Sequence, residues 1–353
     1  MLKISIITLY LCSKCVYLFY SLKIKFLMLI KIHTRKNGVK EMRALIKDKT
    51  DVAVRNIEQP QVQSADDVVI RIALAGLCRT DVFMADGLIN GNETVTLGHE
   101  FAGIVEDAGA DAQGFAKGDR VTVMPVIPCG KCGFCNSGAK DSCQNTTMLG
   151  INHDGAFAEY IRVPANTVYK LPANVSFKHG AYSEPVAAAL AVMKADISPA
   201  QRGFIYGNNR FAKLIRRIMR SYGFDNVSIH DPQTEKLEDN AYDFAIETLA
   251  TEAAMEEIFR AVRPRGRVII RSRKHEPVGI CFDLAVKKEV TMQAVNYGPF
   301  DEAIALMAEG RIQVDDLLGD VHDLESFAAV FAASKTSETS KVFFKPGTEP
   351  EVE

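Results

Sequence analysis

The sequence lacks an excess of charge of either sign. Across 353 residues, 42 Lys and Arg face 44 Asp and Glu, and the formal net charge at pH 7 is -2. Proteins that bind nucleic acid or acidic membranes through their overall field carry a basic excess, so the composition favours neither partner. Apolar residues make up 47% of the chain, which is ordinary for a globular protein with room for two domains.

Long apolar runs are also missing, even in the hydrophobic segment 1–41. Lys14, Lys23, Lys25 and Lys31 divide this segment into runs far shorter than the roughly 18–20 residues that span a bilayer. It has neither the unbroken apolar core nor the small-residue cleavage site of a secretory signal. We interpret 1–41 as an extension outside the natural protein, with translation starting at Met42, and we expect a cytoplasmic protein. A membrane-anchored enzyme is the alternative if the segment is real.

No internal repeat is present, and the pattern of the chain changes once. From Met42 to about Tyr182, short strands alternate with turns, which indicates a mostly β half. From about Pro185 onward, strands and helices alternate, which predicts a parallel sheet with helices on its faces. The strands expected in this second half are 203–207, 226–231, 242–247 and 268–270, and the helices are 186–194, 212–221, 253–262 and 301–309.

Four of the eight cysteines lie close together, at Cys129, Cys132, Cys135 and Cys143. Zinc binds four thiolates at tetrahedral corners, about 2.3 Å from the metal, and two-residue gaps let neighbouring thiolates point at one centre. Glycines between the cysteines permit the tight backbone that this requires. Four protein ligands leave no open position, so the pattern predicts a structural zinc. Free or disulfide-linked thiols and an iron–sulfur cluster are the alternatives.

A second group of metal-ligand types is Cys78 with His99 and Glu100. On their own, one cysteine and one histidine at this separation are weak evidence for a metal site and favour a buried cysteine and an ordinary histidine. Their neighbours Thr80 and Asp81 are compatible with a simple turn.

Together the two groups resemble the medium-chain, zinc-dependent alcohol and polyol dehydrogenases, in particular the sorbitol and threonine dehydrogenase branch. The resemblance runs from Met42 to about Pro346. The matching segments are Gly98–Gly103, Gly118–Val121, the four-cysteine segment, Asp154–Tyr160 and Ser183–Val186.

This resemblance implies roles for individual residues. Cys78, His99, Glu100 and Glu184 match the ligands of a catalytic zinc, which holds the substrate oxygen and lowers the pKa of the alcohol. Thr80 matches the hydroxyl that relays the alcohol proton, and Asp81 is expected to orient a ligand. Two departures stand beside these matches: Arg79 replaces a frequent glycine, and Phe83 replaces the histidine that continues the proton path in many members.

The resemblance also implies NAD(H) or NADP(H) on a Rossmann-type domain, whose fingerprint is a glycine-rich turn after the first strand. Gly207 keeps the first glycine position, but Asn209 stands at the second, where a side chain crowds the pyrophosphate. Arg210 either contacts a phosphate or is solvated. Asp231 suits an acid that binds the ribose 2′-hydroxyl, which favours NAD over NADP, and Lys236 matches a position that often contacts the same ribose. A plain turn at Asp231 is the alternative.

The second half is also short. Residues 232–242 are too few to form both the helix and the strand that normally lie in this interval. We therefore expect a doubly wound sheet that is shortened by one βα unit. A basic cluster that includes Arg271 follows the strand 268–270. It either grips the pyrophosphate in compensation or forms a solvated loop.

We therefore expect an α/β protein with a GroES-like, β-rich catalytic domain at 42–186 and 297–346 and a Rossmann-type nucleotide-binding domain at 187–296. The expected activity is zinc-dependent hydride transfer between NAD(P) and a small polar alcohol or polyol, or its ketone or aldehyde. Two zinc ions per chain and a homodimer or homotetramer complete the expectation. The alternative is a zinc-stabilised binding protein with a degenerate cofactor site and no catalysis.

Overall fold

The computed structural model describes residues 40–274, 276–336 and 339–347. Met42–Glu353 form one compact unit, which is distinct from Met1–Glu41. Apart from Lys40 and Glu41, the segment interpreted as an extension lies outside the described residues, so its origin stays a prediction. No helix in the described ranges is both long and apolar enough to cross a membrane.

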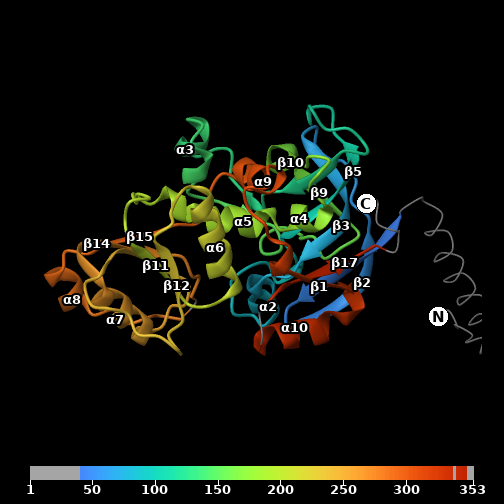
Figure 1. The fold of residues 1–353 in the computed structure, drawn as a ribbon. Coiled ribbons are helices and arrows are strands. Elements are labelled where there is room, and N and C mark those ends of the chain that lie inside the picture. Colours follow the sequence, from blue (N-terminus) through green and yellow to red (C-terminus); the bar gives the residue numbers. More distant parts are fainter. Residues whose placement is uncertain (1–39, 275, 337–338, 348–353) are drawn as a thin grey trace, which may run out of the picture. The chain divides into compact units, whose positions relative to one another are not determined.

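The β-rich half is built around one large sheet, as the alternation of short strands and turns predicted (Figure 1). The strands run in the order β10 (Val168–Lys170), β6 (Arg120–Val123), β5 (Glu100–Ala108), β3 (Asp67–Gly76), β17 (Lys341–Lys345) and β16 (Leu318–Asp323), and β9 (Tyr160–Pro164) also pairs with β3. The antiparallel register of β3 and β5 sets Gly76 opposite Glu100. This register carries the end of β3 to the beginning of β5, where the predicted metal ligands lie.

Two small sheets and short helices surround the large one. The three-stranded sheet has the order β2 (Asp51–Glu58), β1 (Glu41–Asp48) and β4 (Thr94–Thr96). The two-stranded sheet pairs β7 (Val126–Ile127) with β8 (Thr147–Met148), which closes the base of the cysteine-rich lobe. The helices are α2 (Arg79–Ala85), α3 (Gly133–Asn136), α4 (Phe177–Ala181) and α10 (Phe327–Thr336).

The second half contains the predicted parallel sheet, with five strands among the described residues. Their order is β12 (Val227–His230), β11 (Gly203–Tyr206), β13 (Tyr242–Glu247), β14 (Val262–Ile270) and β15 (Thr291–Ala294). Each neighbouring pair is parallel. The usual dinucleotide-binding order has six strands, 3-2-1-4-5-6. The strand that would lie beyond β12 has no counterpart, which agrees with the short interval 232–242.

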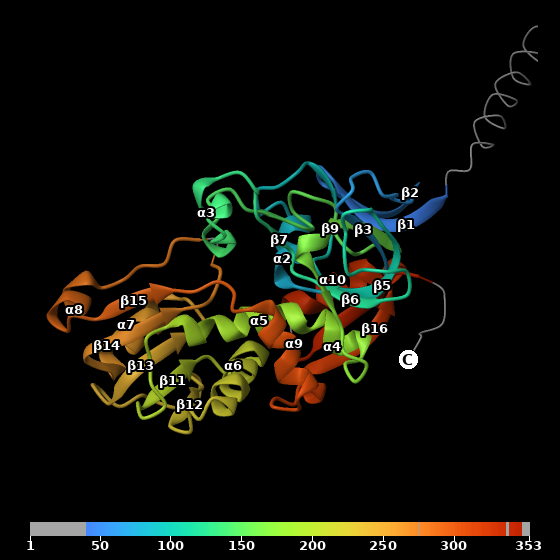
Figure 2. The ribbon, with the colours of Figure 1, turned by 90° about the horizontal axis from the view of Figure 1, so that it is seen from above.

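Helices cover both faces of this sheet, because alternate strand residues point to opposite sides. Ile205 packs in one core with α6 (Arg210–Ser221) and α5 (Ser183–Leu190), whereas Phe204 packs in another with α7 (Glu252–Ala261). Helix α8 (Phe282–Lys287) packs against α7, and α9 (Phe300–Ala308) packs against α5. Figure 2 shows α5 and α9 lying between the two sheets. The carboxyl ends of the parallel strands and the metal-ligand residues therefore belong to one compact unit.

Candidate metal centres and nucleotide site

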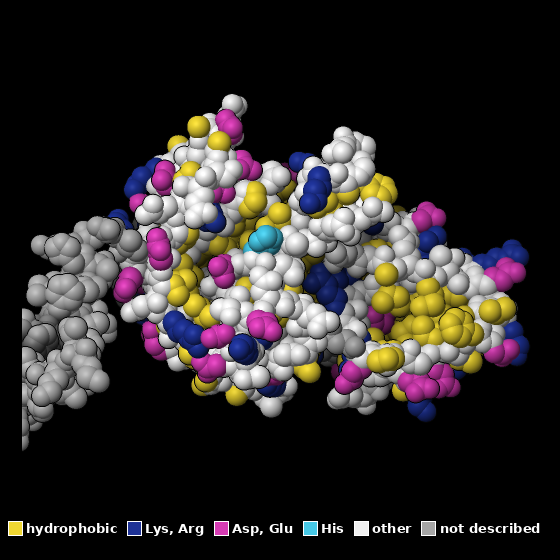
Figure 3. All heavy atoms as spheres, turned by 180° about the vertical axis from the view of Figure 1, so that it is seen from behind, with side chains coloured by type: hydrophobic (Ala, Val, Ile, Leu, Met, Phe, Trp, Pro, Cys, Tyr) yellow, Lys and Arg dark blue, Asp and Glu magenta, His cyan; other side chains and the backbone are white. Residues whose placement is uncertain are grey.

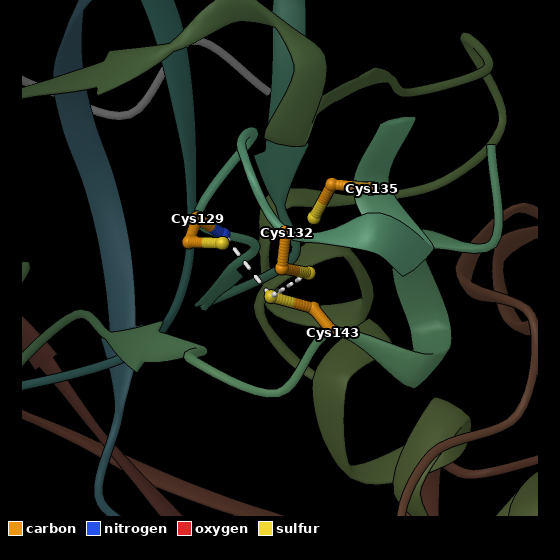
Figure 4. Close-up of side chains that lie close together, drawn as sticks. All are labelled: Cys129, Cys132, Cys135 and Cys143. Atoms are coloured by element: carbon orange, nitrogen blue, oxygen red, sulfur yellow. Dashed lines mark hydrogen bonds between the residues drawn. The ribbon is translucent and has the colours of Figure 1, made fainter. Parts of the chain in front are cut away.

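The four cysteines predicted to bind a structural zinc come together in the lobe between β7 and β8. Their sulfur atoms all lie within 4.8 Å of one another, and all four thiols are free. The backbone N–H of Cys129 donates to Cys143 Sγ at 3.2 Å, and Cys132 Sγ lies 3.9 Å from Cys143 Sγ (Figure 4). Gly130 and Gly138 adopt φ values of 69° and 84°, a conformation that glycine permits at little cost.

The local environment of these thiols suits a tetrathiolate cation site. Backbone N–H groups of Cys135 and Gln144 lower the pKa of Cys132 to about 6, whereas burial raises the pKa of Cys135 to about 12. A divalent cation bound here would stabilise the thiolate form at all four positions, although the pKa values of the free thiols differ. The cluster fits a structural zinc with no open coordination position.

The second predicted group also comes together. Ligand atoms of Cys78, His99 and Glu100 lie within 4.8 Å of one another. Cys78 is the residue before α2, and Glu100 is the first residue of β5. His99 is 0% exposed and Glu100 is 2% exposed, so water cannot readily replace a missing partner at either side chain.

Asp81 organises this group from the first turn of α2. Its carboxylate accepts the backbone N–H of Cys78 at 2.9 Å and of Gly98 at 3.1 Å. It also lies 3.0 Å from Nδ1 of His99. This bond sets the ring so that Nε2 faces the other ligands, and Nε2 is buried without a hydrogen-bond partner in the described structure. An orphaned imidazole nitrogen beside a thiol and a carboxylate fits a metal ion.

Glu184 and Thr80 lie near this group but outside it. Glu184 is buried in the first turn of α5, and Tyr297 donates its hydroxyl to Oε1 of Glu184. Glu184 is therefore not among the three residues whose ligand atoms converge, and its role as a ligand stays a prediction. Thr80 is half-buried in α2. None of the described residues forms a hydrogen bond with its hydroxyl.

Two residues at the site were missed by the sequence reasoning. Tyr297 contacts Glu184, and Lys341 forms a buried ion pair with Glu100. Lys341 is 2% exposed and belongs to β17, which pairs with β3. A lysine directly before the apolar residues Val342–Phe344 was the available signal, because a buried lysine is rarely without a partner. Burial raises the pKa of Glu100, and Lys341 opposes this effect.

The expected glycine-rich turn is filled by its own side chains. Gly207 directly follows β11 and has a φ of 109°. Asn209 caps α6: Oδ1 accepts the N–H of Ala212 at 2.9 Å, and Nδ2 donates to Thr248 Oγ1 at 2.9 Å. The first helix turn, where a pyrophosphate binds in the usual fingerprint, is thus partly satisfied by Asn209.

The other residues predicted to contact the nucleotide are Asp231, Arg210, Lys236 and Arg271. Asp231 accepts a hydrogen bond from Asn208 at 3.1 Å, so the expected ribose-binding acid lies at the same turn as the fingerprint. Arg210 donates to the Tyr182 hydroxyl at 3.1 Å. Lys236 is exposed and follows Asp231 in the loop after β12. Arg271 is buried, with Nε donating to the carbonyl of Ala188 at 2.8 Å.

Comparison with known proteins shows which domain and which enzymes this chain resembles. The profile of the alcohol dehydrogenase GroES-like domain matches residues 64–173. A 2-dehydro-3-deoxy-L-galactonate 5-dehydrogenase from Pseudoalteromonas atlantica is 26% identical over 300 residues, covering 76% of this chain and 88% of that protein. D-xylulose reductase A from Aspergillus oryzae is 25% identical over 322 residues, covering 80% and 90%.

The fold is also that of solved structures. A protein of Sinorhizobium meliloti 1021, described as a zinc-binding dehydrogenase and bound to NADP, superimposes with a TM-score of 0.80. It is 26% identical, and the match covers 87% of this chain and all of that chain. The chain therefore carries an alcohol dehydrogenase GroES-like domain and is similar over most of its length to zinc-dependent alcohol and polyol dehydrogenases, which makes it an oxidoreductase that transfers hydride between a CH–OH group and NAD(P).

Proposed function

We propose that this chain interconverts a small polyol and its ketone or aldehyde, using one catalytic zinc and NAD(H). The observation that carries the proposal is the convergence of Cys78, His99 and Glu100 around the orphaned Nε2 of His99. The relatives named for a galactonate derivative and for xylulose support a polyol-type substrate.

The residues proposed to hold the catalytic zinc are Cys78, His99 and Glu100, with Glu184 as a further carboxylate. Bound there, zinc supplies a Lewis acid that polarises the substrate oxygen. Asp81 holds the His99 ring in one tautomer and fixes the backbone on both sides of the trio. Thr80, half-buried beside Cys78, is proposed to accept the alcohol proton and pass it on, since a hydroxyl both accepts and donates.

The nucleotide is proposed to bind at the carboxyl ends of the parallel strands, where open α/β sheets bind ligands. Contacts are assigned to Gly207, Arg210, Asp231 and Lys236 and to the backbone at Asn209, whereas the buried Arg271, which the sequence predicted as a further nucleotide contact, is assigned to the substrate instead. Asp231 favours NAD over NADP, because a carboxylate accepts from a ribose 2′-hydroxyl and repels a 2′-phosphate. The division into a catalytic domain of 42–186 and 297–346 and a nucleotide domain of 187–296 is part of the same proposal.

A structural zinc is proposed in the lobe of Cys129, Cys132, Cys135 and Cys143, which makes two zinc ions per chain. The lobe contributes no reacting group. Its proposed effect is to fix the segment between β7 and β8, as a four-ligand zinc does in other proteins. A cytoplasmic location, which would keep these thiols reduced, stays a prediction.

We also propose that the chain forms homo-oligomers through the edge of the five-stranded sheet. Strand β15 pairs with β14 on one side only among the described strands. Close to it in sequence are Phe282, 73% exposed, and Val286, 72% exposed. Figure 3 shows a broad hydrophobic area at this end of the protein. An open edge beside exposed apolar side chains favours a protein interface.

The activity is tested by supplying the zinc-loaded protein with NAD⁺ or NADP⁺ and a panel of polyols, and by measuring reduced nucleotide. We expect oxidation of at least one polyol, faster with NAD⁺. Thr80→Ala should lower kcat by about 10²–10⁴-fold, while Thr80→Ser keeps the hydroxyl and most of the rate. Zinc and nucleotide binding without turnover of any polyol or ketone would instead support the non-catalytic alternative.

A further inference from the structure

Two arginines follow β14 at the carboxyl edge of the parallel sheet, Arg271 and Arg273. Arg271 is 6% exposed. Its Nε donates to the carbonyl of Ala188 at 2.8 Å, but no carboxylate of the described residues forms an ion pair with its guanidinium. A buried charge without a counter-ion is costly, and natural proteins retain one where a ligand completes it.

The backbone around Arg271 is held in place by a different acid. Glu247 is 0% exposed and ends β13. Its Oε2 accepts the N–H of Arg271 at 3.3 Å and of Ser272 at 3.2 Å, and its Oε1 accepts the Ser272 hydroxyl at 2.6 Å. Glu247 thus fixes the loop through two backbone N–H groups and the Ser272 hydroxyl, and it forms no ion pair with the guanidinium of Arg271.

Two further observations describe the surroundings of that guanidinium. Its central carbon lies over the ring of Phe211 in α6, 4.9 Å from the centroid, which is within the range of a cation–π interaction. Burial lowers the pKa of Arg271 to about 10, and the positive charge of Arg273 adds to this effect. The two arginines are therefore close enough to repel each other.

Arg273 connects this pair to the metal-ligand residues. Its guanidinium lies 5.2 Å from the ring centroid of Tyr297, and the hydroxyl of Tyr297 donates to Glu184. Arg273 also donates to Asn296 Oδ1 at 2.6 Å and is exposed to solvent. The side chain of Tyr297 thus lies between Arg273 and Glu184.

We propose that Arg271 and Arg273 bind an anionic group of the substrate, a carboxylate or a phosphate, so that the enzyme acts on acidic polyols. This proposal rests on the proposed function, because it takes the neighbouring metal-ligand residues as the reacting centre. Planar guanidinium groups match the paired oxygens of carboxylate and phosphate. The pyrophosphate of the dinucleotide has the same chemistry, and Arg271 contacts α6, so the experiment has to separate the two sources.

The test uses zinc-loaded protein saturated with NADH and calorimetric titration with gluconate, glucitol 6-phosphate and the neutral glucitol. We expect at least one anion to bind more tightly than glucitol. Arg273→Gln should lower the affinity for that anion by roughly ten- to a hundredfold, which corresponds to the loss of one hydrogen bond to a charged group. Glucitol and NADH affinities should not change. Arg273→Lys should recover part of the loss, since it keeps the charge without the fork.

Lys274→Gln is the matched control, because it removes one positive charge from the same loop, where Lys274 pairs with Glu276. It should leave anion binding unchanged. Equal affinity of all three probes for the wild type would overturn the proposal. A weaker NADH affinity in Arg273→Gln, with unchanged preference among the probes, would assign the arginines to the pyrophosphate and also overturn it.

Failure of the proposed function has a different signature. Wild-type protein that binds the anions selectively, loses them in Arg273→Gln and oxidises no polyol retains the anion site without the reaction. Protein that oxidises neutral polyols with no preference for acidic ones retains the reaction without the anion site.

Discussion

At the residue scale, Asp81 does more at the metal-ligand trio than the sequence reasoning assigned to it. It was expected to orient one ligand. Its carboxylate instead contacts the His99 ring and the backbone N–H groups of Cys78 and Gly98. One buried acid thus ties the end of β3 to the beginning of β5, which makes the geometry of the trio depend on Asp81.

Asp81→Asn should weaken the catalytic zinc by about 10–100-fold, the usual cost of losing a partner of a metal-ligating histidine. The amide has one oxygen to accept with and cannot replace both carboxylate oxygens. Retention of zinc should be followed against a chelator of graded concentration. Asp86→Asn, which changes an exposed acid paired with Lys335, is the control. Equal zinc retention in both variants would contradict the role of Asp81.

Asn209 affects stability and nucleotide binding in opposite directions. Asn209→Gly should lower the free energy of unfolding by only a few tenths of a kcal/mol, because glycine is a tolerable helix N-cap. It should tighten NAD binding, since removal of the side chain opens the first turn of α6 to the pyrophosphate. Urea unfolding and calorimetric titration measure the two effects. A weaker NAD affinity would show that the Asn209 amide itself contacts the nucleotide.

The site could be read from the sequence where its residues are local and missed where they are not. The four cysteines of the lobe form one compact motif. Cys78 and the adjacent pair His99 and Glu100 lie in two short segments that the family resemblance brought together. Lys341 and Tyr297 reach Glu100 and Glu184 only through tertiary contacts. No spacing pattern shows such contacts, because the pairing of β17 with β3 creates one and the approach of Gly298 to α5 accompanies the other.

At the element scale, the helices and strands with a clear period were predicted well, whereas the start of one strand and the short helices were not. The strand 242–247 matches β13, and the helix 253–262 matches α7 to within a residue. The strand expected at 268–270 begins earlier, because β14 starts at Val262 and accommodates Arg265 with φ 61°. The short helices α4 and α10 were not predicted, because five to ten residues are too few for a clear helical period.

Asp243 at the start of β13 provides a pH-dependent test of the parallel sheet. Burial acts to raise its pKa, but hydrogen bonds from Arg263 and the N–H of Arg202 outweigh burial and lower it below 3.8. A lowered folded-state pKa adds stability above 3.8 that is lost as the pH falls through the folded-state value.

Asp243→Asn should therefore reduce the free energy of unfolding by roughly 1–2 kcal/mol at neutral pH, and the difference should shrink below pH 3.8. Urea unfolding across this range measures it. Asp225→Asn is a control at an exposed acid with no side-chain partner among the described residues. A difference that stays constant down to acid pH would contradict the account.

At the scale of the whole molecule, the exposed end of the five-stranded sheet is the proposed interface between copies of the chain. Phe282→Glu combined with Val286→Glu should shift an oligomer toward monomer, because two charges would be buried in an apolar interface. Light scattering after size-exclusion chromatography measures the mass. Leu88→Glu, at an exposed apolar residue after α2, is the control. An unchanged mass in the double variant, or a monomeric wild type, would contradict this interface.

We propose separate tasks for the two metal-ligand groups of this chain, a catalytic zinc at one and a structural zinc at the other. Zinc counted by native mass spectrometry, on wild type, Cys78→Ser and Cys143→Ser, tests this claim most directly. We predict two zinc ions in the wild type, one for each group of converging ligands. Cys78→Ser should retain one zinc and a folded lobe while losing dehydrogenase activity. A wild type with a single zinc that Cys78→Ser leaves in place would contradict the claim.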